Sequence, residues 1–269
     1  MDKRKTVAVI GCGALGSIVA RNLERKLGSA YRLTGVLAKN ITHAKALAEH
    51  ASCKACQDIE DLLEDRPDYV VELAGVSAVL EYGEAVLRSG SDFVIVSIGA
   101  LADHATKDRL TRAAEDSGTH IYVVSGAIGG LDVMQTMAIM GLCKASIDNI
   151  KPCGSLNGAP YLKGIPLPED RETLVFDGPV EDAIRGFPKN VNVAVATALA
   201  SDCPNTRVTI QSSPNAARNC HQICLQNEQA EINMTFSSKP DPDNPKSSSI
   251  TAWSVLALLK QLASPIRFF

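Results

Sequence analysis

Three glycines near the start of the chain have the spacing of a phosphate-binding turn. The segment GCGALG places Gly11, Gly13 and Gly16 directly after a short apolar run and at the start of a stretch with helical periodicity. Gly11 permits a tight turn, Gly13 lets a pyrophosphate approach the backbone, and Gly16 lets the helix pack closely on the strand. The N-terminus of that helix supplies amide donors and a partial positive charge. The segment therefore predicts dinucleotide binding.

The residues about 20 positions further on indicate whether the dinucleotide can carry a 2′-phosphate, as NADP does and NAD does not. An acid at the end of the second strand would bind the adenosine ribose and repel a 2′-phosphate. Residues 37–43 read LAKNITH and contain no acid. Lys39, with Asn40, Thr42 or His43, could accept a 2′-phosphate; a solvated turn lysine is the alternative interpretation. The expected cofactor is NAD or NADP, with NADP permitted.

Histidine is the side chain best suited to move protons near neutral pH, and the chain has five. His43, His50, His104 and His120 lie in segments typical of helix surface or strand entry, so exposure to solvent explains them. His221 lies in a predicted strand of the second half. There it is either a catalytic group or a hydrogen-bonded histidine of a sheet.

Eight cysteines raise the question of a metal site. Cys53 and Cys56 form a C-x-x-C pair, and Cys220 and Cys224 flank His221. If the latter segment is a strand, both of its cysteines point to one face and the histidine to the other. They could not share a metal ion, so we expect no metal and reduced, half-buried thiols.

The elements that must position these groups follow two patterns. In the first half, short apolar runs at 6–11, 31–38, 69–75, 92–97 and 121–126 alternate with amphipathic stretches such as 14–27. This alternation indicates an α/β fold with a parallel sheet covered on both faces. We expect residues 1–127 to form a Rossmann domain with a doubly wound parallel sheet.

The pattern changes after about residue 145, where the strands become longer and more polar. One convincing helix interrupts them, at 188–201. Residues 128–246 are therefore expected to form an α+β substrate and dimerisation domain with an open mixed or antiparallel sheet. A breaker-rich stretch, 237–249, precedes a final apolar helix at 250–263. We expect residues 247–269 to pack back on the Rossmann domain.

The composition is that of a soluble globular protein, with 269 residues, 45% of them hydrophobic, and a net charge of −3. The absence of a basic run and the 4% aromatic content argue against a nucleic-acid partner. The apolar run Val7 to Ile10 is too short for a signal peptide or a membrane span, so a cytoplasmic protein without a membrane partner is expected. An open sheet leaves an edge or face to cover, which favours a homodimer.

Six segments along most of the chain share their order and spacing with one family. They are VVELAG (70–75), VSIGALAD (96–103), SGAIGGLDVMQTMA (125–138), FDGPVEDAIRGFPKNVNVAVATALA (176–200), NCHQI (219–223) and KPDPDNPKSSSITAWSVLALLKQL (239–262). The set resembles the L-aspartate dehydrogenase family. The resemblance implies oxidative deamination of L-aspartate with NAD or NADP, through iminosuccinate, to oxaloacetate and ammonia. It also implies that the imine can supply biosynthesis of the nicotinamide ring.

The resemblance assigns roles to particular residues. The family's catalytic histidine corresponds to His221, and nicotinamide contacts correspond to Ala127 and to either Asn190 or Asn192. A proton shuttle suits this chemistry, because hydride transfer needs a neutral amine and imine hydrolysis needs proton exchange with water. The predicted cofactor-binding set is Gly11, Gly13, Ala14, Leu15, Lys39, Ala74, Gly75, Ser97, Ala127, Asn190 and Asn192.

The segment 125–138 is expected both to connect the two domains and to line the cofactor site. Gly126, Gly129 and Gly130 would let the backbone lie against the nicotinamide and turn into the second domain. Asp132 is expected to cap a helix that begins near Leu131.

Substrate carboxylates need cationic or amide donors. The candidate cations are Lys163, Arg171, Lys189, Arg218 and Lys246, and the predicted substrate-binding set is Asn219, Lys163 and Lys189. In the family's basic-Lys-Pro-Pro stretch, this chain has Ile150-Lys151-Pro152-Cys153, without the preceding arginine and the second proline.

Two other functions are compatible with the sequence. One is a dehydrogenase or imine reductase of the same family that acts on another amino acid. The other is a non-catalytic NAD(P)-sensing protein, against which His221 argues, because a sensor needs no proton shuttle.

Overall fold

The computed structural model describes residues 3–188, 190–239 and 248–268. The chain divides into two compact units. The first unit comprises Met1–Val124 and Thr251–Phe269, and the second unit comprises Ser125–Ile250.

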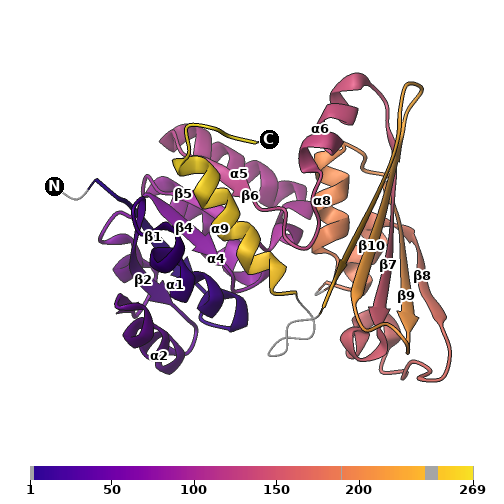
Figure 1. Cartoon of the computed structure of the whole chain (residues 1–269), viewed down its shortest axis with the longest axis horizontal. Coiled ribbons are helices and arrows are strands. Elements are labelled where there is room, and N and C mark those ends of the chain that lie inside the picture. Colours follow the sequence, from indigo (N-terminus) through magenta and orange to yellow (C-terminus); the bar gives the residue numbers. More distant parts are fainter. Residues whose placement is uncertain (1–2, 189, 240–247, 269) are drawn as a thin grey trace. The chain divides into compact units, whose positions relative to one another are not determined.

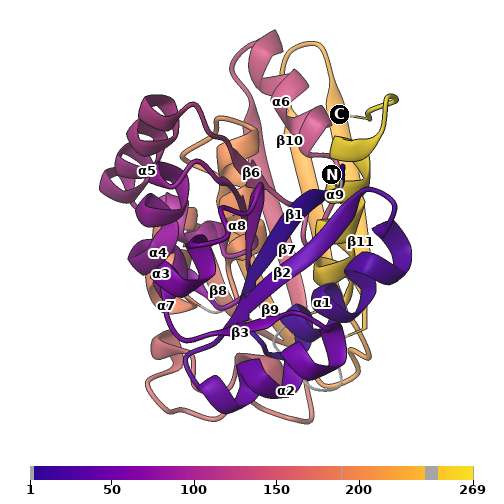
Figure 2. The same cartoon turned by 90° about the vertical axis from the view of Figure 1, so that its left-hand side faces the viewer.

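The first unit contains a six-stranded parallel sheet in the order β3-β2-β1-β4-β5-β6. Its strands are β1 (Lys5–Ile10), β2 (Tyr31–Leu37), β3 (Lys54–Cys56), β4 (Tyr69–Glu72), β5 (Asp92–Ile95) and β6 (Ile121–Val123). Strand order reverses between β1 and β4, and β1 and β2 run side by side (Figure 2). Such a reversal is the point where doubly wound sheets bind ligands. The predicted Rossmann fold is confirmed, although β3, which has only three residues, was not predicted.

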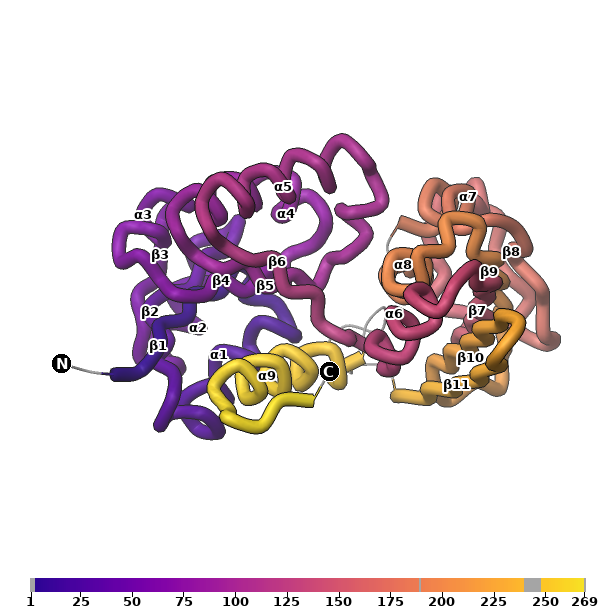
Figure 3. Tube along the Cα trace, turned by 90° about the horizontal axis from the view of Figure 1, so that it is seen from above, coloured from indigo at the N-terminus to yellow at the C-terminus, as the bar shows by residue number. Residues whose placement is uncertain are grey.

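Helices cover both faces of this sheet because its strands are apolar on both sides. The helical elements of this unit are α1 (Ala14–Leu27), α2 (Ile41–Ala51), α3 (Ile59–Leu63), α4 (Val76–Arg88), η1 (Ile98–Ala102), α5 (His104–Ser117) and α9 (Ile250–Ala263). Along β1, Val7 and Val9 join the core beneath α1, α2 and α9, whereas Ala8 and Ile10 join the core beneath α3, α4 and α5. Figure 3 shows α1 and α9 on one side of the sheet and α4 and α5 on the other.

The C-terminal helix α9 is an integral part of this core. Ala252, Val255, Leu256 and Leu259 are buried among side chains of α1 and β2. The hydroxyl of Tyr31 on β2 donates a hydrogen bond of 2.8 Å to the Leu259 carbonyl. A segment more than 200 residues away in the sequence thus completes one face of the parallel sheet.

Tyr31→Phe should weaken this attachment of α9 without leaving a cavity. Loss of the hydroxyl removes one buried hydrogen bond, which lowers the free energy of unfolding by about 1 kcal/mol. Urea denaturation measures the change. Tyr122→Phe is the matched control, since its ring packs on Tyr69 but its hydroxyl makes no hydrogen bond within the described residues. Equal stability losses in the two variants would contradict a role for the Tyr31 hydroxyl.

The second unit contains a five-stranded sheet in the order β11-β10-β7-β9-β8. Its strands are β7 (Lys144–Pro152), β8 (Thr173–Pro179), β9 (Arg207–Ser213), β10 (Asn219–Gln226) and β11 (Glu231–Ser238). The β7–β9 pair is parallel and the other pairs are antiparallel, so the predicted mixed sheet is confirmed. Its helical elements are α6 (Leu131–Met140), η2 (Cys153–Leu156), η3 (Pro160–Leu162), α7 (Val180–Gly186) and α8 (Asn192–Ala200).

Helices α6 and α8 lie on one face of this sheet (Figure 1). The predicted helix at 188–201 is shorter than expected, since α8 begins at Asn192, and α7 was not predicted. Side chains alternate along β7 and β10, so that every second one is buried. None of the described helices has both the length and the apolar composition of a membrane span.

Candidate active site

The glycine turn of the first unit is open at the N-terminus of α1. Gly11 has a φ of +110°, and a Cβ there would lie 2.7 Å from the Leu73 carbonyl carbon. A Cβ on Gly16 would overlap the Gly11 carbonyl oxygen. Gly13 is exposed, and a Cβ there would meet nothing within 4 Å. The turn therefore leaves free space in front of the amides of Ala14 and Leu15, the first residues of α1.

Two further loops leave the same edge of the parallel sheet. Ala74 and Gly75 follow β4, and Ser97 follows β5. The Leu73 amide donates to the Ile10 carbonyl at 2.8 Å, which brings the first of these loops beside the glycine turn. Three groups of predicted cofactor contacts thus come together at the carboxyl ends of β1, β4 and β5, where ligands of such sheets bind.

The predicted 2′-phosphate contact lies at the end of β2. Lys39 is exposed there. Asn40 is the N-cap of α2, and its side-chain oxygen accepts from the Thr42 amide at 2.9 Å. The Asn40 oxygen is therefore engaged in capping, whereas no described residue pairs with the Lys39 ammonium.

His221 lies in the second unit, buried in β10 opposite Asn149 of β7. Its Nδ1 lies 2.7 Å from the Asn149 side-chain oxygen, and the Asn149 amide nitrogen donates to the Thr209 carbonyl at 3.1 Å. This second contact fixes the orientation of the amide, so its oxygen must face the ring and accept from Nδ1–H. The neutral tautomer therefore carries its lone pair on Nε2.

Lys151 is a second titratable group on this buried face. It follows Asn149 by two residues on β7, points to the same side, and is 4% exposed. Within the described part of the chain, no hydrogen bond or ion pair engages its ammonium group. Burial lowers its pKa to about 8. For His221, burial and then the charge of Lys151 lower the pKa to about 3, so the ring is neutral.

Asn219 adds an unused acceptor to the same face. It precedes His221 by two residues on β10 and is 4% exposed. Within the described residues its side-chain oxygen has no hydrogen-bond partner, and neither has the hydroxyl of Ser238, its register partner on β11. Because unpaired buried polar groups are costly, they mark a place where a polar ligand would be stabilised.

The glycine-rich segment lies over the same region of the second sheet. A Cβ on Gly129 would lie 3.2 Å from the ring of Phe236, the register partner of His221. A Cβ on Gly130 would overlap the sulfur of Met234. Close packing on β11 therefore leaves little room for a Cβ at these two positions, which the sequence alone did not indicate.

The cap of α6 differs from the sequence prediction. The N-cap is Gly130, with a φ of +71°, and no side chain caps this end. Asp132 is the second residue of the helix and lies in its first turn, because the helix already begins at Leu131. Its carboxylate therefore interacts with the helix dipole rather than with the capping position.

The two candidate asparagines lie on either side of the start of α8. Asn190 donates from its side chain to the Ser155 carbonyl at 3.2 Å, which ties this turn to η2. Asn192 is the first residue of α8. Both are half-buried, as is Ala127 in the second unit's opening segment.

The cations proposed from sequence are dispersed over the second unit. Lys163 ends η3 in an exposed turn with a φ of +48°, and Arg171 and Arg218 are also exposed. Lys189 and Lys246 lie outside the described residues. Lys151, which is not among these five candidate cations, is the one on the buried face. Its spacing from Ile147 and Asn149 in the sequence could have indicated that all three side chains lie on one face of the strand.

The missing arginine of the family's basic-Lys-Pro-Pro stretch would stand at position 150. Ile150 points to the opposite face of β7 from Lys151 and His221. The second proline would stand at position 153, where Cys153 begins η2 and its sulfur accepts from the Ser212 hydroxyl at 3.0 Å. Both departures therefore leave the buried polar face itself unchanged.

Cysteines do not join His221. Cys220 and Cys224 point away from the buried face of β10, as strand alternation requires. Among the residues that the structure describes, no three His, Cys, Asp or Glu side chains are grouped to hold a metal ion.

Comparison with known proteins decides the family. Residues 132–262 match the family model for the C-terminal region of aspartate dehydrogenase, and residues 11–124 match that of the NAD binding domain of homoserine dehydrogenase. An L-aspartate dehydrogenase of Methanocaldococcus jannaschii is 33% identical over 264 residues, which cover 97% of this chain and 98% of that protein. The chain belongs to the L-aspartate dehydrogenase family. The resemblance found in the sequence is thereby confirmed.

Other members of the family agree along the whole chain. L-aspartate dehydrogenase 2 of Bordetella bronchiseptica is 36% identical over 259 residues, covering 95% of this chain and 96% of that protein. The crystal structure of aspartate dehydrogenase from Thermotoga maritima has a TM-score of 0.73 at 25% identity, and covers 99% of this chain and 100% of that one. As a member of this family, the protein is an amino-acid dehydrogenase that depends on a pyridine nucleotide.

Proposed function

We propose that the protein catalyses the oxidative deamination of L-aspartate with NAD or NADP, through iminosuccinate, to oxaloacetate and ammonia. The observation that carries this proposal is the buried polar face of the second sheet. It combines a base at His221 with a cation at Lys151 and an acceptor at Asn219, neither of which has a partner among the described residues. A carboxylate with a neighbouring amine satisfies all three groups.

The glycine turn of the first unit fits a dinucleotide. The free space at Gly13, in front of the first amides of α1, would accept a pyrophosphate. Gly11, Gly13, Ala14 and Leu15 would hold it, and the loops carrying Ala74, Gly75 and Ser97 would line the same sheet edge. Bound NAD or NADP supplies the acceptor for the hydride of the substrate's α-carbon. Lys39 permits NADP.

His221 would serve as the proton shuttle. Its Nε2 lone pair accepts a proton from the substrate ammonium, which makes the amine neutral and able to release a hydride from the α-carbon. Asn149 holds the ring in this tautomer and accepts a hydrogen bond from the imidazolium that forms. In imine hydrolysis, the same nitrogen takes a proton from the attacking water and returns it to the departing ammonia.

Lys151 would bind one substrate carboxylate. The bound negative charge offsets the positive charge that depresses the pKa of His221, so substrate binding makes the histidine a stronger base. Asn219 would accept a hydrogen bond from the substrate amine. Ala127 and Asn190 or Asn192 stay candidates for the nicotinamide, and Lys163 and Lys189 for the second carboxylate.

Amino-acid selectivity tests the proposed function. Purified protein with NAD or NADP at alkaline pH should reduce the nicotinamide with L-aspartate about 10–200 times faster than with L-glutamate, which is one methylene longer. The near-ultraviolet absorbance of the reduced nicotinamide measures the rate. Faster turnover of another amino acid would assign the protein to a different substrate of the same family. Nucleotide binding without turnover of any amino acid would favour an NAD(P)-sensing protein.

We also infer a homodimer that the second unit forms. Its sheet ends in the edge strands β8 and β11, and Leu174 on β8 is 58% exposed. Unpaired edges and exposed apolar side chains favour burial against a second copy. Light scattering should give twice the mass of the chain, and a monomer at micromolar concentration would contradict the inference.

A further inference from the structure

Glu72 is a fully buried carboxylate at the end of β4 that none of the proposed roles uses. Its Oε1 accepts from the amides of Ala74 and Gly75, both at 2.7 Å, and from the Ser97 hydroxyl at 2.9 Å. Its Oε2 accepts from the Ser97 amide at 2.9 Å and from the Val96 amide at 3.3 Å. Two oxygens thus receive five hydrogen bonds.

These five donors come from two loops. Glu72 and Ile95 are paired at the ends of the neighbouring strands β4 and β5, and one loop follows each of them. Four of the donors are backbone amides. The carboxylate therefore holds the main chain of both loops in place, and not only the Ser97 side chain. The amides of the loop after β4 both donate to Oε1 and the amides of the loop after β5 both donate to Oε2, so all four amides are satisfied only when both carboxylate oxygens accept.

We infer that Glu72 is a positioning residue for the cofactor, which holds the loops after β4 and β5 in the conformation that binds the dinucleotide. The inference rests on the proposed function, because Ala74, Gly75 and Ser97 are the proposed cofactor contacts in these loops. Glu72 acts through them, since its own carboxylate is 0% exposed and fully occupied.

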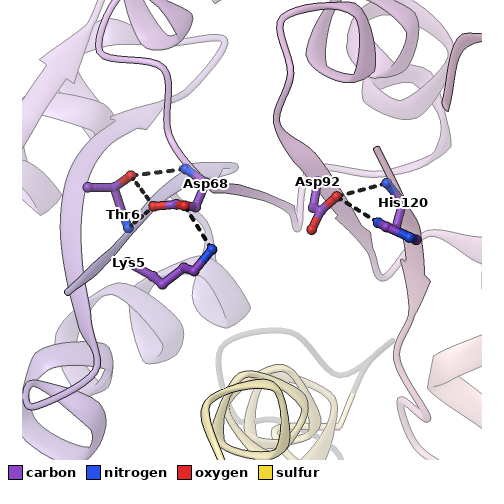
Figure 4. Close-up of polar contacts among 5 residues, drawn as sticks. All are labelled: Lys5, Thr6, Asp68, Asp92 and His120. Carbon is purple, nitrogen blue, oxygen red and sulfur yellow. Dashed lines mark hydrogen bonds and ion pairs between the residues drawn. The ribbon is translucent and has the colours of Figure 1, made fainter. Parts of the chain in front are cut away.

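Asp68 provides a matched carboxylate at the other end of the same strand. It precedes β4, and its Oδ2 accepts from the amide and the hydroxyl of Thr6 at 2.7 and 2.9 Å (Figure 4). Its Oδ1 accepts from Lys5 at 3.1 Å. Asp68 therefore also joins two segments of the first unit through hydrogen bonds, but at the edge of the sheet opposite the proposed cofactor loops.

Glu72→Gln and Asp68→Asn separate cofactor positioning from a purely structural role. The single oxygen of a glutamine amide can accept from the backbone amides of one loop only, while its NH₂ group faces the backbone amides of the other. We expect the dissociation constant of NADH or NADPH to rise about tenfold or more in Glu72→Gln and less than about twofold in Asp68→Asn. Fluorescence titration of the reduced nucleotide measures both, and thermal unfolding reports the stability of each variant.

Glu72→Asp and steady-state kinetics complete the test. Aspartate keeps the charge but is too short to reach both loops, so its nucleotide affinity should fall as well. With the expected outcome, KM for the nucleotide rises, whereas kcat at saturating nucleotide and KM for the amino acid stay within about threefold of wild type. If Glu72→Gln does not fold, the Glu72→Asp variant decides.

Three outcomes would overturn the inference. The first is wild-type nucleotide affinity in the folded Glu72 variants. The second is an equal loss of affinity in Asp68→Asn, which would make the effect one of general stability. In the third, the wild type binds neither nucleotide, and then the proposed function fails together with the inference.

Discussion

His221→Ala should lower kcat for L-aspartate oxidation by about 10²–10⁴-fold, the usual contribution of a positioned general base. The alanine variant loses the Nε2 lone pair that we propose takes the ammonium proton, while the neighbouring Asn149 stays anchored to the Thr209 carbonyl. Its affinity for the reduced nucleotide should stay within about twofold of wild type, since His221 belongs to the second unit and the glycine turn to the first. Steady-state kinetics and fluorescence titration measure the two quantities.

His120→Ala is the control for this experiment. His120 is exposed at the start of β6, and its amide and ring nitrogen both contact the Asp92 carboxylate at the amino edge of the parallel sheet (Figure 4). This variant should keep wild-type kcat. Equal activity of His221→Ala and His120→Ala would rule out a proton-transfer role for His221.

Lys151→Met is expected to raise KM for L-aspartate by about 10–150-fold, as the loss of a charge-assisted hydrogen bond to a carboxylate requires. Methionine has a similar length but no charge. Because it replaces a buried cation that has no partner within the described residues, the variant should be at least as stable as wild type. Loss of binding together with retained stability would distinguish a ligand site from a structural lysine.

Lys151 should make both the stability of the protein and its affinity for a dicarboxylate depend on pH. The pKa of Lys151 falls from 10.5 to about 8 on folding, so between these values the unfolded chain binds more protons than the folded one. The contribution of Lys151 to stability therefore rises with pH through this interval, so the stability of wild type relative to Lys151→Met should increase. The affinity for succinate, which has two carboxylates and no amine, should fall above about pH 8 as Lys151 loses its charge. A succinate affinity that is independent of pH would contradict the assignment.

Much of the first unit could be predicted because its signals are local. The apolar runs at 6–11 and 69–75 and the glycines at 11, 13 and 16 define strand, turn and helix within a few residues of sequence. The missed strand β3 pairs only Lys54, Ala55 and Cys56 with β2, which is too short for a periodic pattern. The five hydrogen bonds to Glu72 could not be predicted either. They form only where the loops after β4 and β5 lie side by side, and Glu72 and Val96 are 24 residues apart in the sequence.

In the second unit, sequence identified the catalytic candidate but not its surroundings. His221 could be singled out from a resemblance, yet its pairing with Asn149 requires the register of β7 and β10, 72 residues apart. Lys151 could be named only as part of the basic-Lys-Pro-Pro stretch, because it is the position of the strand in the fold that places its side chain on the buried face. The roles of Gly129 and Gly130 in packing on β11 likewise depend on contacts about 100 residues away along the chain.

A crystal structure with a bound nucleotide and a non-reacting dicarboxylate such as succinate would test the central claim most directly. We expect one carboxylate within hydrogen-bond distance of the Lys151 ammonium, and the ligand's carbon chain beside Nε2 of His221. The Nδ1–Asn149 contact should remain. A dicarboxylate bound elsewhere, with Lys151 and His221 both without a ligand contact, would contradict the assignment of this buried face as the site of amino-acid oxidation.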